Sequence, residues 1–212
     1  ENFDQENGKY IGIDVDLITE IAKVEGFEFE LKPMDFGGII PALQSGQIDG
    51  AIAGASITDE RKKSVDFSDP YYETGIVAVV NSANTTIKAG KDLEGKKLAV
   101  KNGTAGASYV EENLKGKSEA VTFKDTVSMF QAVTNNQADA AFEDYPVIAY
   151  ALSKDPASKL KIGTEKLTTG NYGFMVKKGS NPELVAKFNE GLKKLKANGK
   201  YDEIVAKYVG KK

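Results

Sequence analysis

Gly54-Ala55-Ser56-Ile57-Thr58-Asp59-Glu60-Arg61 joins a short apolar run, residues 51–53, to a predicted helix over 59–65 that Thr58 is placed to cap. A strand that ends in a small-residue loop and then opens a helix exposes free backbone N–H groups, which favour anions. Arg61 gains nothing from the helix dipole in the first turn. Its planar guanidinium suits a carboxylate better than any other side chain. The segment therefore predicts a carboxylate-binding corner. The alternative is that Arg61 pairs with a neighbouring carboxylate on a solvent-exposed face: Asp59, Glu60 or Asp66.

Outward from this corner, helical and strand patterns alternate along the chain. Helices are predicted over 14–25, 37–45, 107–114, 126–135, 146–153, 182–198 and 201–208. Strands or extended runs are predicted over 27–31, 50–53, 71–81, 97–100, 120–123, 138–142 and 172–176. Strands that alternate with helices indicate an α/β fold with mainly parallel sheets covered by helices.

An internal similarity indicates two lobes of one design. Residues 42–52 correspond position by position to 132–142, and each stretch has a residue tolerant of the left-handed conformation after its helix, Gly46 or Asn136. Ligands in open α/β sheets bind beyond the carboxyl ends of strands, so the residues after each strand are expected to face one another across a cleft.

The predicted lobes are discontinuous in sequence. Lobe one is expected to comprise residues 1–74 plus 171–212, and lobe two residues 75–170. The extended segments 71–80 and 171–176 connect them, and two neighbouring connections of this kind permit hinge closure.

Composition narrows the function. The chain has 212 residues with 28 Lys plus Arg and 31 Asp plus Glu, a net charge of −3, which argues against a nucleic-acid binder. It has no Cys, so a Cys-ligated metal site is excluded. It also has no His, which is the commonest general base and the commonest metal ligand. No run approaches the roughly eighteen apolar residues of a membrane span. No signal peptide is recognised, so a mature or trimmed form is expected.

Several long motifs carry a resemblance to a known family. The motifs are residues 10–17, 31–36, 53–63 with 65–72, and 101–104. The similarity follows the same order and covers nearly the whole chain. The sequence resembles the polar amino-acid-binding proteins of ABC importers, most closely their glutamine-binding branch. The resemblance implies the two-lobed periplasmic-binding-protein type 2 fold, with two doubly wound sheets joined by two hinge strands, closing on one free amino acid.

A free amino acid carries a carboxylate and an ammonium, and burying it requires partners for both charges. Arg61 is the candidate for the carboxylate, with backbone N–H groups of Ser56 and Ala105 and the hydroxyls of Ser56 and Thr104. Asp144 and the Gly54 carbonyl are the candidates for the ammonium.

By resemblance, Lys101 would reach the ligand side chain and Phe36 would stack on its aliphatic part. Plainer interpretations exist for each. Phe36 could be a core aromatic, Lys101 a solvated lysine at a strand end, and Asp144 a helix N-cap.

Two departures from the family pattern matter. Glu143 stands where the glutamine-binding branch often has a histidine. A carboxylate there would accept from a side-chain amide but would also attract a basic ligand, whereas Lys101 would repel one unless Glu143 neutralises it. We rank glutamine first and arginine second.

The second departure is that the family's first strand has no counterpart here. Its loss is expected to leave apolar surface and unpaired backbone groups on both sides of the place that it would occupy. Site residues that the family carries on that strand cannot be assigned.

The favoured function is a solute-binding protein that hands its ligand to an ABC permease. A rival is a small-carboxylate dehydratase on the same scaffold, with Glu143 or Lys101 as the acid; a sensor domain is a third alternative. We expect no catalytic residue, metal or cofactor, no nucleic-acid partner, a monomer, and a periplasmic or other extracytoplasmic location.

Overall fold

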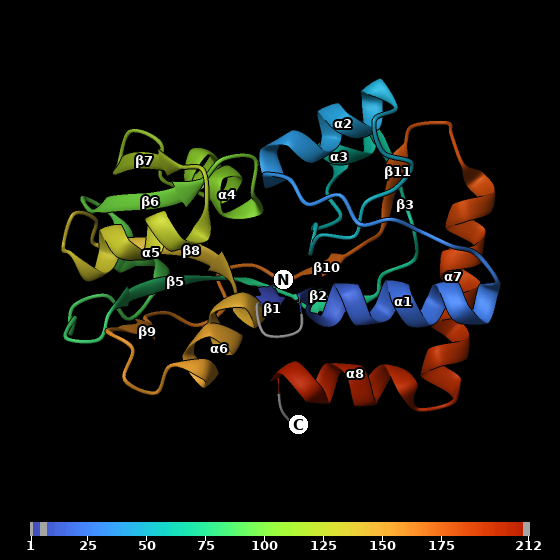
Figure 1. Cartoon of the computed structure of the whole chain (residues 1–212). Helices are drawn as coiled ribbons and strands as arrows, with labels where there is room; N and C mark the ends of the chain where they lie inside the picture. The colour runs from blue at the N-terminus through green and yellow to red at the C-terminus, as the bar shows by residue number, and fades with distance from the viewer. Residues whose placement is uncertain (1, 5–7, 210–212) are drawn as a thin grey trace. The chain divides into compact units, whose positions relative to one another are not determined.

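The computed structural model describes residues 2–4 and 8–209 (Figure 1). The chain forms two compact units. Unit 1 comprises Glu1–Met34, Gly38–Glu73 and Asn171–Lys212, and unit 2 comprises Asp35–Gly37 and Thr74–Gly170. Within the described ranges, no helix has the length and apolar character needed to cross a bilayer.

Unit 2 is built on a five-stranded sheet of order β7-β6-β8-β5-β9. Its strands are β5 (Ile76–Asn81), β6 (Lys97–Lys101), β7 (Glu119–Phe123), β8 (Ala140–Asp144) and β9 (Leu160–Ile162). β6 runs parallel to both β7 and β8, whereas β5 runs antiparallel to β8 and β9. The sheet is therefore mixed rather than mainly parallel. Parallel neighbours need a crossover connection, usually a helix, and β5 is not joined to its neighbours in that way.

Helices cover both faces of this sheet (Figure 1). They are α4 (Ala105–Asn113), α5 (Thr126–Thr134) and α6 (Tyr145–Lys154), with a 3₁₀ turn η2 (Gly90–Leu93). Alternate residues of β5 face opposite sides of the sheet. Ala78 belongs to a hydrophobic cluster with Val110 of α4, whereas Val79 belongs to a second cluster with Met129 of α5. Because β5 is buried on both faces, its sequence is a continuous apolar run.

In its described residues, unit 1 has a helical layer and only short strand pairs. Its helices are α1 (Ile13–Glu25), α2 (Ile39–Ser45), α3 (Asp59–Lys62), α7 (Pro182–Ala197) and α8 (Lys200–Val209). Its strands are β1 (Asn2–Asp4), β2 (Lys9–Ile11), β3 (Val65–Phe67) and β11 (Met175–Lys177), paired β1 with β2 and β3 with β11. β4 (Tyr72–Thr74) pairs with β10 (Gly170–Tyr172), and the chain passes between the units within these two strands.

Helices α1, α7 and α8 pack together in unit 1 (Figure 1). α1 ends at Glu25, and its C-cap Gly26 adopts the left-handed conformation with φ 70°, as the sequence predicts. α7 approaches α1 closely at Gly191, where an added Cβ would lie 2.8 Å from the Ile21 side chain. These contacts fix the helical layer that supports the unit 1 loops.

Three local predictions in unit 1 are wrong. Residues 27–31 form no strand, and the 50–53 strand is reduced to a single bridge between Ala51 and Met175. The helix predicted over 59–65 stops at Lys62 because Val65 begins β3 instead. Alternation alone does not make a strand, since a strand also needs a partner for its backbone groups. Phe29 and Leu31 in this stretch are 41% and 38% exposed.

Candidate ligand-binding site

The unit 1 corner, defined by Gly54, Ser56 and Arg61, rests on a buried carboxylate. The Gly54 N–H donates to Asp14 Oδ2 at 2.7 Å and to the Tyr71 hydroxyl at 3.1 Å, and that hydroxyl donates to Asp14 Oδ1 at 2.9 Å. Gly54 has φ 56°, and its backbone lies against the Tyr172 ring. Burial, followed by the Asp14 charge, raises the pKa of Tyr71 well above its ordinary value, so the phenol remains a proton donor. The network therefore holds the turn that presents the next residues.

Arg61 is held by the same corner. Its backbone N–H donates to Thr58 Oγ1, confirming the predicted cap, and its Nη1 donates to the Ser56 carbonyl at 2.7 Å. Ser56 and Tyr172 lie opposite each other in an antiparallel β-bridge, but its hydrogen bonds are made by the residues on either side of them. The Ser56 N–H therefore points away from β10. The carboxylates considered as alternative partners each pair with a lysine: Asp59 with Lys62, Glu60 with Lys63 and Asp66 with Lys178.

Replacing Tyr71 with phenylalanine tests the support of this corner. The change removes one donor to a carboxylate, Asp14, that is only 8% exposed, and leaves the ring packing intact. We expect the free energy of unfolding to fall by about 1–3 kcal/mol, measured by urea denaturation. Tyr145→Phe, at a position 41% exposed, is the matched control and should change little. Equal stabilities of the two variants would contradict a structural role for the Tyr71 hydroxyl.

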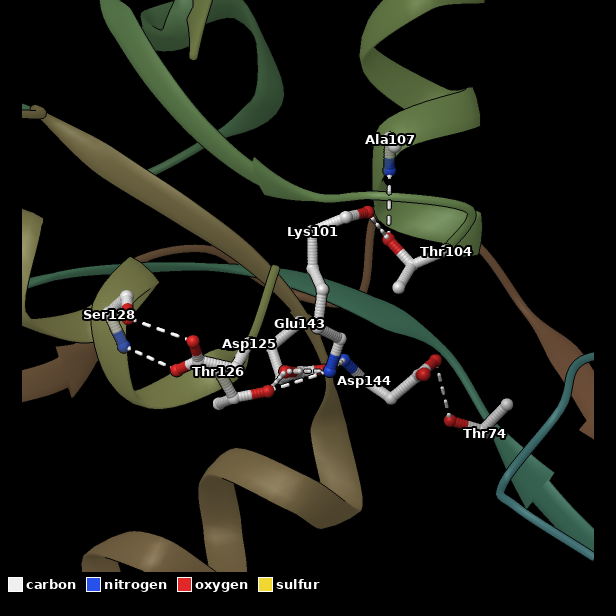
Figure 2. Close-up of polar contacts among 9 residues, drawn as sticks. All are labelled: Thr74, Lys101, Thr104, Ala107, Asp125, Thr126, Ser128, Glu143 and Asp144. Carbon is white, nitrogen blue, oxygen red and sulfur yellow. Dashed lines mark hydrogen bonds and ion pairs between the residues drawn. The ribbon is translucent and has the colours of Figure 1, made fainter. Parts of the chain in front are cut away.

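The unit 2 corner is defined by Lys101, Thr104, Ala105, Glu143 and Asp144. Two of these residues, Lys101 and Glu143, form a polar triad with Thr126 (Figure 2). Lys101 Nζ donates to Thr126 Oγ1 at 2.6 Å and lies 3.2 Å from Glu143 Oε2, and Thr126 Oγ1 donates to the same oxygen at 2.8 Å. The parallel register pairs Leu98 with Ala140, which brings the ends of β6 and β8 together.

Burial makes this triad a closed unit. The Lys101 side chain is 16% exposed and that of Glu143 is 4% exposed, so Lys101 is not a solvated lysine. The other Glu143 oxygen, Oε1, accepts from the Asp144 N–H at 3.1 Å. Both carboxylate oxygens are thus engaged within unit 2. Glu143 neutralises Lys101, which is one of the two outcomes that the sequence left open.

Asp144 ends β8 and occupies the N-cap position of α6, but its side chain makes no capping hydrogen bond. Instead, Oδ1 accepts from Thr74 Oγ1 at 3.3 Å (Figure 2). The plain interpretation is therefore confirmed for the N-cap position, but not for a side-chain capping bond. The carboxylate is half-buried at the carboxyl end of a central strand, which is the edge where ligands bind in open α/β sheets.

The N-terminus of α4 completes the unit 2 corner. Thr104 caps this helix: its Oγ1 accepts from the Ala107 N–H at 3.2 Å and donates to the Lys101 carbonyl at 2.7 Å. Its hydroxyl proton is thereby used within the turn. Ala105 is the first helical residue, where backbone N–H groups have no partner within the helix. An added Cβ at Gly106 would lie 2.9 Å from Phe142 Cβ, so glycine allows this helix end to pack on β8.

Phe36 opens the 3₁₀ turn η1 (Phe36–Gly38), and residues 35–37 cluster with unit 2. An added Cβ at Gly37 would lie 3.1 Å from Asn102 Nδ2, which places this turn beside the loop after β6. Phe36 is half-buried, unlike a core aromatic. Its stacking role stays a prediction, as do the ligand contacts of the other residues in both corners.

Three functional candidates were missed from the sequence. Asp14 and Tyr71 hold the Gly54 turn, and Thr126 links Lys101 to Glu143. Asp14 and Tyr71 lie within motifs that carry the family resemblance, which was an available signal. Thr126 begins α5 after the capping Asp125 and had no signal of its own, because its contacts come from β6 and β8.

Comparisons with known proteins agree with this geometry. The family described as bacterial extracellular solute-binding proteins, family 3, matches residues 2–211. A probable histidine-binding protein of Campylobacter jejuni is 34% identical, covering 98% of this chain and 79% of the relative.

Two solved structures, titled an ancestral arginine-binding protein bound to glutamine and bound to arginine, are each 44% identical. Their TM-scores are 0.90 and 0.91, they cover 99% and 98% of this chain, and this chain covers 92% of each. The predicted resemblance and the two-lobed periplasmic-binding-protein fold class are confirmed. The chain belongs to family 3 of the bacterial extracellular solute-binding proteins.

Proposed function

We propose that this protein binds one free polar L-amino acid, with glutamine preferred, and that both corners serve the same ligand. Arg61 and the Ser56 and Ala105 N–H groups would take the α-carboxylate. Asp144 and the Gly54 carbonyl would take the α-ammonium. Phe36 would contact the aliphatic part of the ligand. This division supplies a partner for each charge, which a buried zwitterion requires.

The observation that carries the preference for glutamine is the Lys101–Glu143 ion pair. Glu143 already accepts from Lys101, Thr126 and the Asp144 N–H, so it offers little to a further cation. A lysine ammonium has three donors, and two of them go to Thr126 and Glu143. The third suits a neutral acceptor such as a side-chain amide oxygen. A guanidinium at the same place would meet a like charge.

Arginine is the second candidate ligand. The two ancestral structures are titled as complexes with glutamine and with arginine, so one closely similar scaffold accommodates both. Binding of arginine here would require Glu143 to turn from Lys101 toward the ligand. That exchange costs a buried ion pair, which ranks arginine below glutamine.

The same network argues against the dehydratase alternative. An acid catalyst needs a proton poised for a leaving hydroxyl, but Lys101 and Glu143 satisfy one another. We propose instead that this monomeric protein acts outside the cytoplasm and delivers its ligand to an ABC-importer permease. The two chain crossings in β4 and β10 would serve as the hinge for closure.

Calorimetric titration of refolded, ligand-free protein tests this function. Glutamine, arginine, histidine, asparagine and glutamate are titrated separately, and one-to-one binding with glutamine tightest is expected. The matched control is the α-carboxamide of glutamine, which lacks the free α-carboxylate and should bind poorly. A preference for arginine would reverse the ranking, and silence toward all five amino acids would overturn the proposed function.

A further inference from the structure

Thr126 is the helical member of the polar triad. It is the first residue of α5, whereas Lys101 ends β6 and Glu143 lies in β8. The path to this place is set by β7, because Phe123 at the end of β7 is the partner of Lys101 in the parallel register. The start of α5 is thereby brought next to the end of β6.

Helix α5 does not use the Thr126 hydroxyl for its own cap. Asp125 is the N-cap, and its carboxylate accepts from the Ser128 N–H at 2.8 Å and from the Ser128 hydroxyl at 2.9 Å (Figure 2). The Thr126 side chain is half-buried, and its hydroxyl contacts Lys101 and Glu143 instead. The hydroxyl therefore serves the triad and not the helix.

The chemistry of the three groups fixes the direction of each hydrogen bond. An ammonium only donates and a carboxylate only accepts, whereas a hydroxyl does both. Thr126 Oγ1 accepts from Lys101 Nζ at 2.6 Å and donates its proton to Glu143 Oε2 at 2.8 Å. Both distances are shorter than the 3.2 Å between Lys101 Nζ and Glu143 Oε2. The hydroxyl is thus the closest link between the two charges.

This link decides what the two charges still offer to a ligand. Glu143 Oε2 accepts from Lys101 and from Thr126, and the Glu143 side chain is only 4% exposed. Removing the hydroxyl would take one donor from this nearly buried oxygen and one acceptor from the Lys101 ammonium. A buried carboxylate oxygen that loses a donor favours any other donor within reach, above all a charged one.

We propose that Thr126 is a positioning residue that sets the charge selectivity of the ligand site. Its hydroxyl fixes the Lys101 ammonium beside Glu143, so that one ammonium donor is left for a neutral acceptor and Glu143 is closed to a ligand cation. The ligand class that follows is a polar amino acid with an uncharged acceptor in its side chain. This inference rests on the proposed function and assigns its selectivity to a residue that acts through Lys101 and Glu143.

Thr126→Val removes the hydroxyl and keeps the shape of the side chain. The measured quantity is the Kd for arginine divided by the Kd for glutamine, from calorimetric titration. This ratio should fall by about tenfold or more, because a hydrogen bond to a charged group passes from the protein to the guanidinium. Thr126→Ser keeps the hydroxyl but loses the methyl group, and its ratio should stay within about threefold of wild type. A role in packing alone would not be rescued by serine.

Thr134→Val is the matched control in the same helix. The Thr134 hydroxyl donates to the Gln131 carbonyl at 3.0 Å and takes no part in the triad. Both Kd values of this variant should therefore equal those of wild type.

A double-mutant cycle with Glu143→Gln separates positioning from a general structural effect. The amide removes the charge at this place with nearly the same shape, so a guanidinium gains no carboxylate when Thr126 is also changed. In the Glu143→Gln background, Thr126→Val should therefore alter the ratio by less than about threefold. An equal fall in both backgrounds would show that Thr126 does not act through Glu143, and it would overturn the proposal.

Nuclear magnetic resonance of the Lys101 ammonium tests the positioning step without any ligand. With isotope-labelled lysine side chains, the ammonium protons of Lys101 should exchange slowly with water in wild type and Thr126→Ser, and faster in Thr126→Val. Silence of the wild type toward every amino acid, with this difference intact, would overturn the proposed function and with it the selectivity assigned to Thr126. Normal glutamine binding with an unchanged ratio in Thr126→Val would overturn this inference alone.

Discussion

Replacing Arg61 with alanine is expected to raise the Kd for glutamine about 30- to 4,000-fold. Truncating one partner of a buried charge pair costs about 2–5 kcal/mol, much of it from leaving the other charge unpaired. Arg61 is half-buried, and its Nη1 donates to the Ser56 carbonyl at 2.7 Å, so part of the guanidinium is held within the corner. Calorimetric titration measures the change in Kd.

Arg61→Lys is the matched variant for charge. Lysine keeps the charge but lacks the planar fork, so its affinity should lie between those of wild type and Arg61→Ala. Lys62→Ala, one residue further along α3, should bind normally, because Lys62 pairs with Asp59 on an exposed face. Glutamine binding by Arg61→Ala within threefold of wild type would show that the α-carboxylate is held elsewhere.

Replacing Lys101 with methionine is expected to reverse the ligand preference. The change leaves the Glu143 carboxylate, which is 4% exposed, without its cation. Removing one partner of a buried ion pair destabilises a protein by about 3–5 kcal/mol. A ligand guanidinium would replace the lost charge, so arginine should raise the Tm of this variant more than glutamine does. Thermal denaturation with each ligand measures both effects.

Lys97→Met provides the control within the same strand. Lys97 lies 3.6 Å from Glu119 with both side chains well exposed, and such surface pairs contribute little. It should therefore keep the glutamine preference and nearly the wild-type stability. If Lys101→Met still prefers glutamine over arginine, the Lys101–Glu143 pair does not set ligand charge selectivity.

Local signals in the sequence located most helices and four of the five strands in the unit 2 sheet, but not β9. α1 follows from its apolar spacing and from Gly26, and β5 follows from its continuous apolar run. The Thr58 cap was also predictable, because a hydroxyl before a short helix satisfies a nearby N–H. These features depend on residues within one helical turn or one strand.

The strand expected over 27–31 shows where local reasoning stops. Its alternation of Phe27, Phe29 and Leu31 is genuine, but a strand is completed by hydrogen bonds to another segment. No neighbouring residue reports whether that partner is present. That residues 27–31 form no strand therefore became visible only from the structure.

The family, the α/β character and the residue types suited to a zwitterion were predictable from the residues alone: Arg61, Asp144 and the small-residue corners. The state of Lys101 and Glu143 was not, because it depends on how distant parts of the chain pack. The register of β6 on β8 brings these distant residues together, and Thr126 from α5 joins them. Charge at a buried site depends on neighbours through space, because each ion's cost is offset only by groups within a few ångströms.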